Sequence, residues 1–332
     1  MTSDFEAYFL VGPTATGKTA VAHELAHKLG LEILSADAML VYRGLDIGTA
    51  KPTATDRAGL HYHGIDLVTL DQDFSVGTFL QHARQAFADC RQRGHRMLVT
   101  GGTGLYVKAL LQGLDSEGAP DPARREYWNQ RLVVEGLPSL QDEAEKLSPG
   151  ILAHMSDAQN PRRVIRVLER LEEGLDPLPS PVRSHKAVAG AWQSPDTATA
   201  PMPGLWFDPP DLNRRIEQRI DRMFEDGLLA ETQSLREKYP TWSKTASSAI
   251  GYAEALAVLE DRMTESEAKE RIAARTRQLA KRQRTWYRHQ LNVSWVGGPA
   301  DAADVARAAA AVERIWVQNG AQKLLCFENL PT

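Results

Sequence analysis

The feature that most restricts how this chain can fold is the stretch GPTATGKT at residues 12–19. It follows the apolar run YFLV at residues 8–11 and precedes a helical pattern from Ala20 to Leu29. The spacing G-x-x-x-x-G-K-T lets a tight glycine turn aim backbone N–H groups at a phosphate, beside the partial positive charge of a helix N-terminus. The sequence therefore predicts a phosphate-binding loop between a strand and a helix. This pattern leaves open whether the phosphates belong to a nucleotide or to another diphosphate.

The residue types in this loop suit two partners, a diphosphate and a Mg²⁺ ion. Lys18 offers a point charge to phosphate oxygens, and the hydroxyl of Thr19 is a predicted ligand of Mg²⁺. The residues predicted to hold the diphosphate are Gly12, Thr14, Ala15, Thr16, Gly17, Lys18 and Thr19.

Length and composition narrow the class of protein. A chain of 332 residues is too long for one ordinary core, so we expect a main domain with a smaller insertion. It contains no run of 18 apolar residues and no basic N-terminal leader, so we expect no membrane partner and a cytoplasmic location. The net charge of -4 means that any nucleic-acid partner must be bound by local basic patches. We expect a monomer.

Two further strand ends carry polar residues. The run LEILS at 31–35 is followed by Asp37, and the run MLVT at 97–100 is followed by GGTGLY. Strands that alternate with helices predict an α/β fold with a parallel sheet, whose ligand crevice lies at the carboxyl ends of the strands. Asp37 is thus expected to face the ligand of the phosphate loop. The alternative is that Asp37 only caps the next helix.

The pattern changes near residue 115, where a charged helical region with little strand signal begins. The predicted organisation is a phosphate-loop core with an inserted all-helical domain. Its parts are residues 1–115 (core, first part), 116–203 (insertion), 204–298 (core, second part) and 299–332 (helical tail).

Two stretches are basic enough to suggest a polyanionic partner. The first, in the insertion, places Arg162, Arg163, Arg166 and Arg170 where one helix face would carry them. The second, residues 271–288, holds seven cations and no acid. The alternative for the first is a solvated face paired with nearby glutamates. In the second, Trp286 and Tyr287 would either stack on bases or anchor a helix to the core.

Six motifs, taken in order, resemble those of the tRNA dimethylallyltransferases. They are GPTATGKT at 12, SADAMLVYRGLDIGTAKP at 35, GGTGLY at 101, PRRVIR at 161, AIGY at 249 and TRQLAKRQRTW at 276. The resemblance implies a P-loop NTPase-like core, and transfer of a dimethylallyl group from dimethylallyl diphosphate to N6 of adenosine 37 in tRNA. It also implies that the insertion grips the anticodon stem-loop.

The resemblance assigns roles to individual residues. Asp37 matches the general base, Thr103 matches a residue that helps to place the base or the adenine, and Arg215 is our choice for an added diphosphate contact from the helix near residues 214–219. The predicted tRNA contacts are Ala38, Met39, Leu40, Arg125, Arg162, Arg163, Arg166, Gly251, Tyr252, Gln278, Lys281 and Arg282.

Two positions depart from the family pattern. Ala38 stands where the family usually has Ser, and Ser248 stands where it often has Arg, so a hydrogen bond and a charged contact with tRNA are expected to be missing. Three rival functions stay open: a P-loop small-molecule kinase, a prenyltransferase acting on free adenylate, and a protein that binds tRNA without efficient catalysis.

Overall fold

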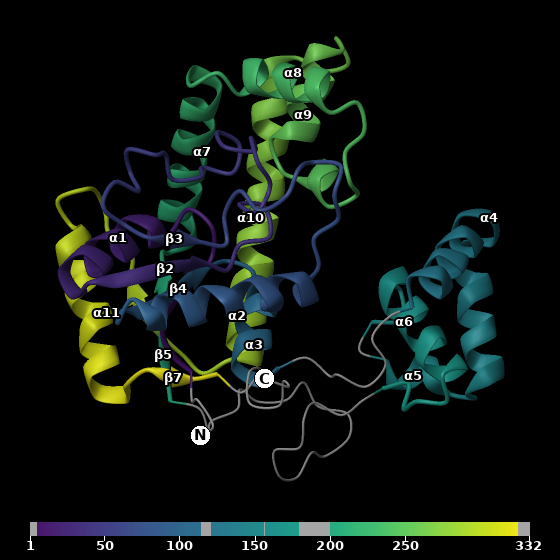
Figure 1. The fold of residues 1–332 in the computed structure, drawn as a ribbon. Coiled ribbons are helices and arrows are strands. Elements are labelled where there is room, and N and C mark those ends of the chain that lie inside the picture. Colours follow the sequence, from purple (N-terminus) through teal and green to yellow (C-terminus); the bar gives the residue numbers. More distant parts are fainter. Residues whose placement is uncertain (1–4, 114–120, 156, 179–199, 325–332) are drawn as a thin grey trace. The chain divides into compact units, whose positions relative to one another are not determined.

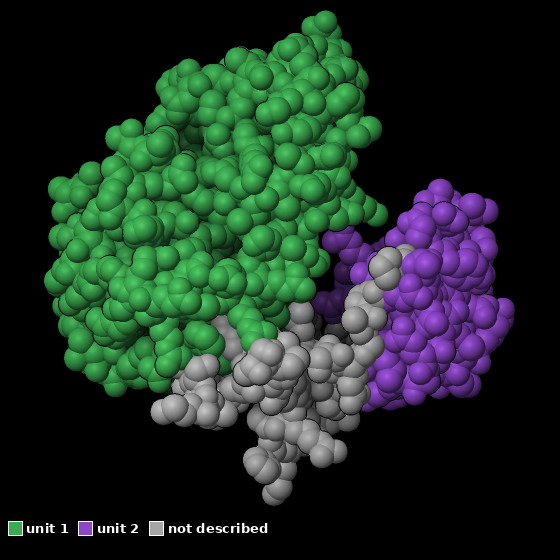
Figure 2. All heavy atoms as spheres, viewed as in Figure 1, with its two compact units in different colours: residues 1–113, 193–332 green, residues 114–192 purple. Residues whose placement is uncertain are grey.

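The computed structural model describes residues 5–113, 121–155, 157–178 and 200–324. The chain divides into two compact units, coloured separately in Figure 2: residues 1–113 together with 193–332, and residues 114–192.

The large unit is organised around a seven-stranded sheet of order β3-β2-β4-β1-β5-β6, with β7 beside β1 (Figure 1). Neighbouring strands are parallel except β7, which runs antiparallel to β1. The strands are β1 (Glu6–Val11), β2 (Leu31–Ser35), β3 (Tyr62–His63), β4 (Arg96–Gly101), β5 (Met202–Trp206), β6 (Val293–Gly297) and β7 (Gln322–Lys323). Because β2, β4 and β1 are neighbours, the loops that follow them begin side by side. The predicted parallel α/β core is confirmed.

Helices pack on both faces of this sheet. One face is covered by α1 and α11, where Leu10, Ile33 and Leu98 are buried. The core of the other face includes residues of α2, α3, α7 and α10. The helices of this unit are α1 (Lys18–Leu29), α2 (Val76–Gln92), α3 (Gly104–Gln112), α7 (Pro209–Glu225), α8 (Leu228–Lys238), η1 (Ala246–Ser248), α9 (Tyr252–Leu259), α10 (Glu265–Gln290) and α11 (Val305–Asn319). None of the helices described is long and apolar enough to cross a membrane.

Local signals fix several helix ends. The hydroxyl of Ser75 accepts the Thr78 N–H at the start of α2. A capping box formed by Thr264 and Glu267 starts α10. Gly30 ends α1 in the left-handed conformation, with φ of 62°.

The small unit is helical where it is described, and forms its own core. It consists of α4 (Pro122–Leu147), α5 (Ile151–His154) and α6 (Pro161–Glu172), with α4 kinked at Gly136. Trp128, Leu140, Ile165 and Leu168 are buried together. An all-helical insertion is therefore confirmed. Its end differs from the predicted limit at 203, because Met202 and Pro203 already pair with β6 in the large unit.

The predicted tail, residues 299–332, is in part an element of the core. The side chain of Trp316 on α11 is only 5% exposed, and its indole N–H donates to the Phe9 carbonyl oxygen at 2.9 Å. The short strand β7, which the sequence did not predict, pairs with Glu6 and Ala7 at the start of β1. A strand of two residues is too short to show an alternating pattern in the sequence, so only its pairing with β1 identifies it.

Replacing Trp316 with Ala should reduce the free energy of unfolding by about 3–5 kcal/mol, because a large buried ring and its hydrogen bond are lost. Urea denaturation followed by circular dichroism measures this change. The matched control is Val317→Ala on the same helix, whose side chain is 80% exposed and whose loss should change stability by less than about 0.5 kcal/mol. Equal effects of the two substitutions would show that α11 is not part of the core.

Candidate active site

The phosphate loop has the backbone geometry that the sequence predicted. It connects the end of β1 to the start of α1, and Gly17 has a φ of 83° where it caps the helix. Gly12 has a φ of 142°, and a Cβ there would lie 2.6 Å from the Leu205 carbonyl oxygen, so only glycine fits beside β5. No acid lies in the first turn of α1. The free N–H groups at this helix end therefore suit an anion.

Lys18 lies in the wall of a cavity of about 720 Å³, together with Thr19 and Asp37. Its Nζ donates to the Pro13 carbonyl oxygen at 2.5 Å. Burial lowers the pKa of Lys18 to about 8, because the charged form loses its hydration; the nearby carboxylate of Asp37 raises this pKa, and Arg219 lowers it. A bound diphosphate would favour the charged form of the lysine.

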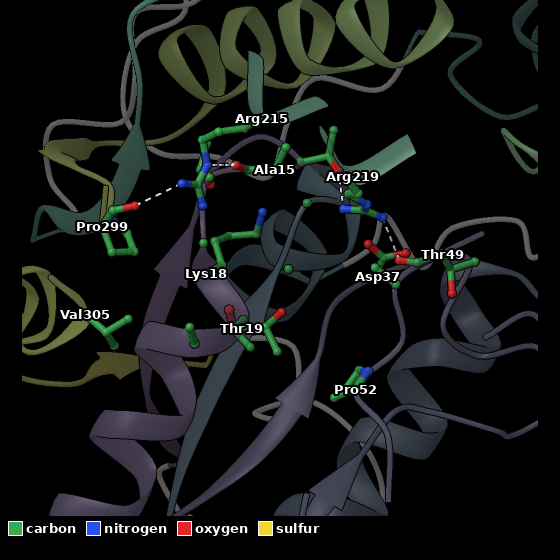
Figure 3. A pocket seen from close by; sticks show the side chains of 18 of the residues that line it. Ala15, Lys18, Thr19, Asp37, Thr49, Pro52, Arg215, Arg219, Pro299 and Val305 are labelled. Atoms are coloured by element: carbon green, nitrogen blue, oxygen red, sulfur yellow. Dashed lines mark hydrogen bonds between the residues drawn. The ribbon is translucent and has the colours of Figure 1, made fainter. Parts of the chain in front are cut away.

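Two arginines of α7 reach this cavity in different ways (Figure 3). Arg215 donates to the Ala15, Pro299 and Ala300 carbonyl oxygens at 3.0–3.2 Å. Arg219 donates to Thr14 Oγ1 at 3.3 Å and to the Thr49 carbonyl oxygen at 2.9 Å. All of these acceptors are neutral, so both guanidinium groups keep a charge that an anion can use.

The sequence favoured Arg215 and did not single out Arg219. The structure adds Arg219 and places it near Asp37 and Lys18. The charge of Arg219 lowers the pKa of Lys18. Burial lowers the pKa of Arg219 itself, and the Asp37 carboxylate raises it. The signal present in the sequence is the RIEQR spacing, which sets both arginines just before buried isoleucines of α7, Ile216 and Ile220. That spacing does not predict which of the two arginines contacts the phosphate loop and which contacts the loop near Thr49.

Asp37 and Thr103 are held together by the turns that follow β2 and β4. The Thr103 backbone N–H donates to the Ala36 carbonyl oxygen at 3.1 Å, and the Ala38 N–H donates to Thr103 Oγ1 at 3.0 Å. Asp37 Oδ1 accepts the N–H of Met39 at 2.9 Å. One carboxylate oxygen thus stabilises the turn, and no hydrogen bond within the described residues uses the other. Asp37 lines the cavity, so it is more than the N-cap that the alternative interpretation proposed.

A second cavity, of about 490 Å³, adjoins the first. Five residues line both cavities: Thr14, Asp37, Thr49, Arg219 and Gln283. The first cavity contains the phosphate loop, whereas much of the second is apolar wall from α7 and α10, including Ile216, Met223 and Leu279. The pair can hold an anion on one side and a second group on the other, with a carboxylate between them.

Helix α10 carries the basic stretch, and acids from other helices neutralise part of it. Arg275 forms an ion pair with the buried Glu254 of α9, and Arg277 lies 3.4 Å from Glu217 of α7. The expectation that the cations of this stretch lack compensating acids is therefore wrong for Arg275 and Arg277, because their acids come from distant parts of the sequence. Tyr287 is fully buried, so it anchors the helix and does not stack on bases.

The three residues of α10 that were predicted to contact tRNA remain exposed. Gln278 and Arg282 line the second cavity, and Lys281 faces solvent. Within the described part of the chain, Lys281 and Arg282 form no ion pair. Of the predicted contacts near Asp37, Ala38 and Met39 line the second cavity and Leu40 lines the first.

Tyr252 requires a correction, because its side chain is 0% exposed and cannot reach a tRNA in this structure. Its hydroxyl donates to Glu231 at 2.5 Å and accepts the N–H of Gly48 at 3.1 Å. Gly251 is also buried, and its N–H donates to Glu254. Tyr252 therefore supports the loop that leads to Thr49, and Gly251 begins α9, which the sequence could not show.

The arginines of the small unit differ from one another. Arg162 and Arg163 are exposed, whereas Arg125 and Arg166 both pair with the buried carboxylate of Glu169. Arg170 is 1% exposed and donates to the Asp176 carbonyl oxygen, so it does not share an exposed face with the others.

Ser248 stands where the family pattern often has Arg, and Arg275 of α10 places a cation next to it. Its Nη2 donates to the Ser248 carbonyl oxygen at 3.1 Å, and both residues line the second cavity.

Comparisons with known proteins give a consistent family. The IPP transferase family model matches residues 40–290, and an isopentenyl transferase model matches residues 5–72. The tRNA dimethylallyltransferase of Deinococcus radiodurans is 39% identical over 312 residues, which cover 90% of this chain and 93% of that protein. The tRNA dimethylallyltransferase 1 of Trichlorobacter lovleyi is 37% identical, with 91% and 96% covered. The solved tRNA isopentenylpyrophosphate transferase of Bacillus halodurans is 30% identical, with a TM-score of 0.64 and 95% and 97% covered.

The charges around Lys18 generate a prediction for its titration. Asp37→Asn should lower the pKa of Lys18 below its value of about 8, because a stabilising negative charge is removed, and Arg219→Gln should raise it. Carbon NMR of labelled lysine side chains across pH 6–11 measures both shifts. Arg214→Gln, on the exposed side of α7, is the control and should leave the titration unchanged. A wild-type pKa near 10.5 would contradict the assigned burial.

Proposed function

Because this chain belongs to the IPP transferase family, we propose that it transfers the dimethylallyl group of dimethylallyl diphosphate to N6 of adenosine 37 in tRNA, next to the anticodon. The observation that carries the proposal is the position of Asp37 in the wall common to both cavities. The proposal places the diphosphate in the first cavity and the adenine in the second. The proposal also takes the protein to act as a monomer in the cytoplasm, where tRNA is found.

In the proposed reaction, N6 of the adenine attacks the carbon that bears the diphosphate. The bond between this carbon and the diphosphate oxygen breaks, a carbon–nitrogen bond forms, and the N6 proton passes to the Asp37 carboxylate. The diphosphate leaves with the electron pair of the broken bond. Asp37 suits the role of base, because the structure leaves one of its oxygens without an internal hydrogen bond.

The leaving diphosphate gains negative charge, and the residues of the first cavity can stabilise it. The backbone N–H groups of the phosphate loop, Lys18 and Arg219 all lie at this wall. Arg215 also holds the loop in place through the Ala15 carbonyl oxygen. Because the acceptors of both arginines are neutral, their charges are available to the leaving group.

The donor set of the first cavity fits a Mg²⁺ ion. Thr19, Ser35 and Thr100 provide hydroxyl oxygens at its wall, and Asp37 provides a carboxylate. Mg²⁺ takes few protein ligands and completes its shell with phosphate oxygens and water, which suits this sparse set of hard donors. Thr19 would hold the ion, which would supply added positive charge to the diphosphate.

The adenine must leave its stack to enter the second cavity, so the proposed reaction includes base flipping. Thr103 Oγ1 accepts the Ala38 N–H, which leaves its own proton free to donate to the adenine. The exposed cations Lys281 and Arg282 would meet the tRNA backbone, and Arg162 and Arg163 of the small unit would grip the anticodon stem.

Transfer to tRNA can be distinguished from its rivals in one assay. The protein is incubated with Mg²⁺, labelled dimethylallyl diphosphate and either tRNA or AMP. Label in tRNA alone supports the proposal, label in AMP indicates the adenylate prenyltransferase, and no label with retained tRNA binding indicates a binding protein. The absence of both label and tRNA binding indicates the kinase, for which a second incubation with labelled ATP should then show phosphate transfer.

Asp37→Asn should reduce the rate of transfer by about 10²–10⁴, because a general base acts on the rate. The affinity for tRNA should stay within a few-fold, as measured by filter binding. The control is Asp211→Asn, which removes a partly exposed acid of α7 and should retain full activity. More than about a tenth of the wild-type rate in Asp37→Asn would remove this residue from the role of base.

The double substitution Lys281→Ala/Arg282→Ala should weaken tRNA binding and reduce the slope of log affinity against log salt by about 1–2 units. The reason is the loss of two phosphate contacts, at roughly 0.7 per contact for single strands. Affinity is measured at several salt concentrations, together with a melting curve.

The control for this slope is Lys28→Ala/Arg314→Ala, which removes the same charge from α1 and α11. It should leave the slope unchanged. If both double variants shift the slope equally, net charge explains the effect and α10 does not contact the tRNA backbone.

A further inference from the structure

Gln283 of α10 contacts both segments that carry the proposed chemistry. Its Oε1 accepts the backbone N–H of Thr14 at 2.8 Å, and its Nε2 donates to the carbonyl oxygen of Gly102 at 3.0 Å. Only one orientation of the amide allows both bonds, because Thr14 presents a donor and Gly102 an acceptor. Gln283 therefore ties the phosphate loop to the turn that holds Thr103.

The same helix packs closely on this turn at two more points. Tyr287 donates from its hydroxyl to the Gly101 carbonyl oxygen at 3.2 Å. A Cβ at Gly102 would lie 2.4 Å from Nε2 of Gln283, and a Cβ at Gly104 would lie 2.1 Å from the Trp286 ring. The approach thus depends on the absence of side chains at both glycines. Such close packing lets a shift of α10 move the turn with it.

Several residues of α10 close to Gln283 in the sequence are exposed to solvent. Gln278, Lys281 and Arg282 are exposed, and Arg282 is the residue next to Gln283. Gln283 lies in the wall shared by both cavities. One short segment of α10 therefore carries exposed cations and the amide that binds the phosphate loop.

We propose that Gln283 is a positioning residue that couples tRNA binding to diphosphate binding. A tRNA bound to the exposed residues of α10 fixes this helix, and Gln283 transmits its position to Thr14 and Gly102 together. The inference rests on the proposed function, since it takes both ligands from it. By thermodynamic linkage, each ligand then strengthens the binding of the other by the same factor.

The test compares tRNA affinity with and without saturating inorganic diphosphate and Mg²⁺. In the wild type, diphosphate should tighten tRNA binding about tenfold, within the usual range of coupling. In Gln283→Met, which keeps the size of the side chain and removes both hydrogen bonds, this factor should fall below about twofold. The factor is the ratio of two tRNA affinities of the same variant, so a change in its affinity for tRNA alone does not alter the test.

The matched control is Gln278→Met, the same exchange at an exposed residue of α10 that has no hydrogen bond to the phosphate loop among the described residues. It should weaken tRNA binding itself and leave the coupling factor unchanged. A melting curve for each variant checks folding, and the reciprocal titration of diphosphate with and without tRNA must give the same factor.

Two outcomes would overturn the inference. One is a wild type that binds both ligands without coupling, and the other is a Gln283→Met variant with the wild-type factor, which would reveal a purely structural glutamine. A wild type that fails to bind tRNA or diphosphate at all would instead overturn the proposed function, and the inference with it.

Discussion

A diphosphate site must hold several positive charges close together without giving each of them its own counter-ion. In this protein, Lys18 and Arg219 share one cavity with Asp37, whose charge acts on both of them, and Asp301 also lines the wall. This arrangement has an electrostatic cost at Lys18, whose pKa is lowered to about 8 because burial disfavours its charged form. Neutral carbonyl and hydroxyl groups hold the two arginines of α7 in place. Much of the surrounding structure serves to bring these acceptors to the right positions.

The loop that carries Thr49 shows how far this support extends. Glu231 of α8 accepts the Ile47 N–H at 3.1 Å, and Tyr252 of α9 accepts that of Gly48. Burial raises the pKa of Glu231, and the hydrogen bond from Tyr252 lowers it. Two helices far along the chain thus position the carbonyl group that binds Arg219. The buried Tyr252 thus supports this loop through its hydrogen bonds to Gly48 and Glu231.

The cations of the chain separate into structural and available groups. On α10, Arg275 and Arg277 pair with acids of α9 and α7, while Lys281 and Arg282 remain exposed. In the small unit, the carboxylate of Glu169 pairs with Arg125 and Arg166. An ion pair with a buried acid costs much to break, because it leaves an uncompensated charge in the interior. The exposed arginines and lysines are therefore the ones suited to exchange their counter-ions for a polyanion.

The sequence by itself determined those features of the protein that depend on the backbone geometry of short segments. The phosphate loop follows from its glycine spacing and its place between strand and helix, and Asp37 and Thr103 follow from polar residues placed directly after buried strands. The parallel sheet and the helical insertion were predictable from the same periodicities. These features need only local backbone geometry and the rule that parallel strands end at one edge.

Long-range contacts decided the rest. The choice of Arg219 beside Arg215, the burial of Tyr252, the pairing of β7 with β1 and the two bonds of Gln283 each join residues that are far apart in the sequence. A sequence shows which side chains can carry charge or form hydrogen bonds. It does not show which acceptor lies within 3 Å, because that distance is set by how the helices pack on the sheet.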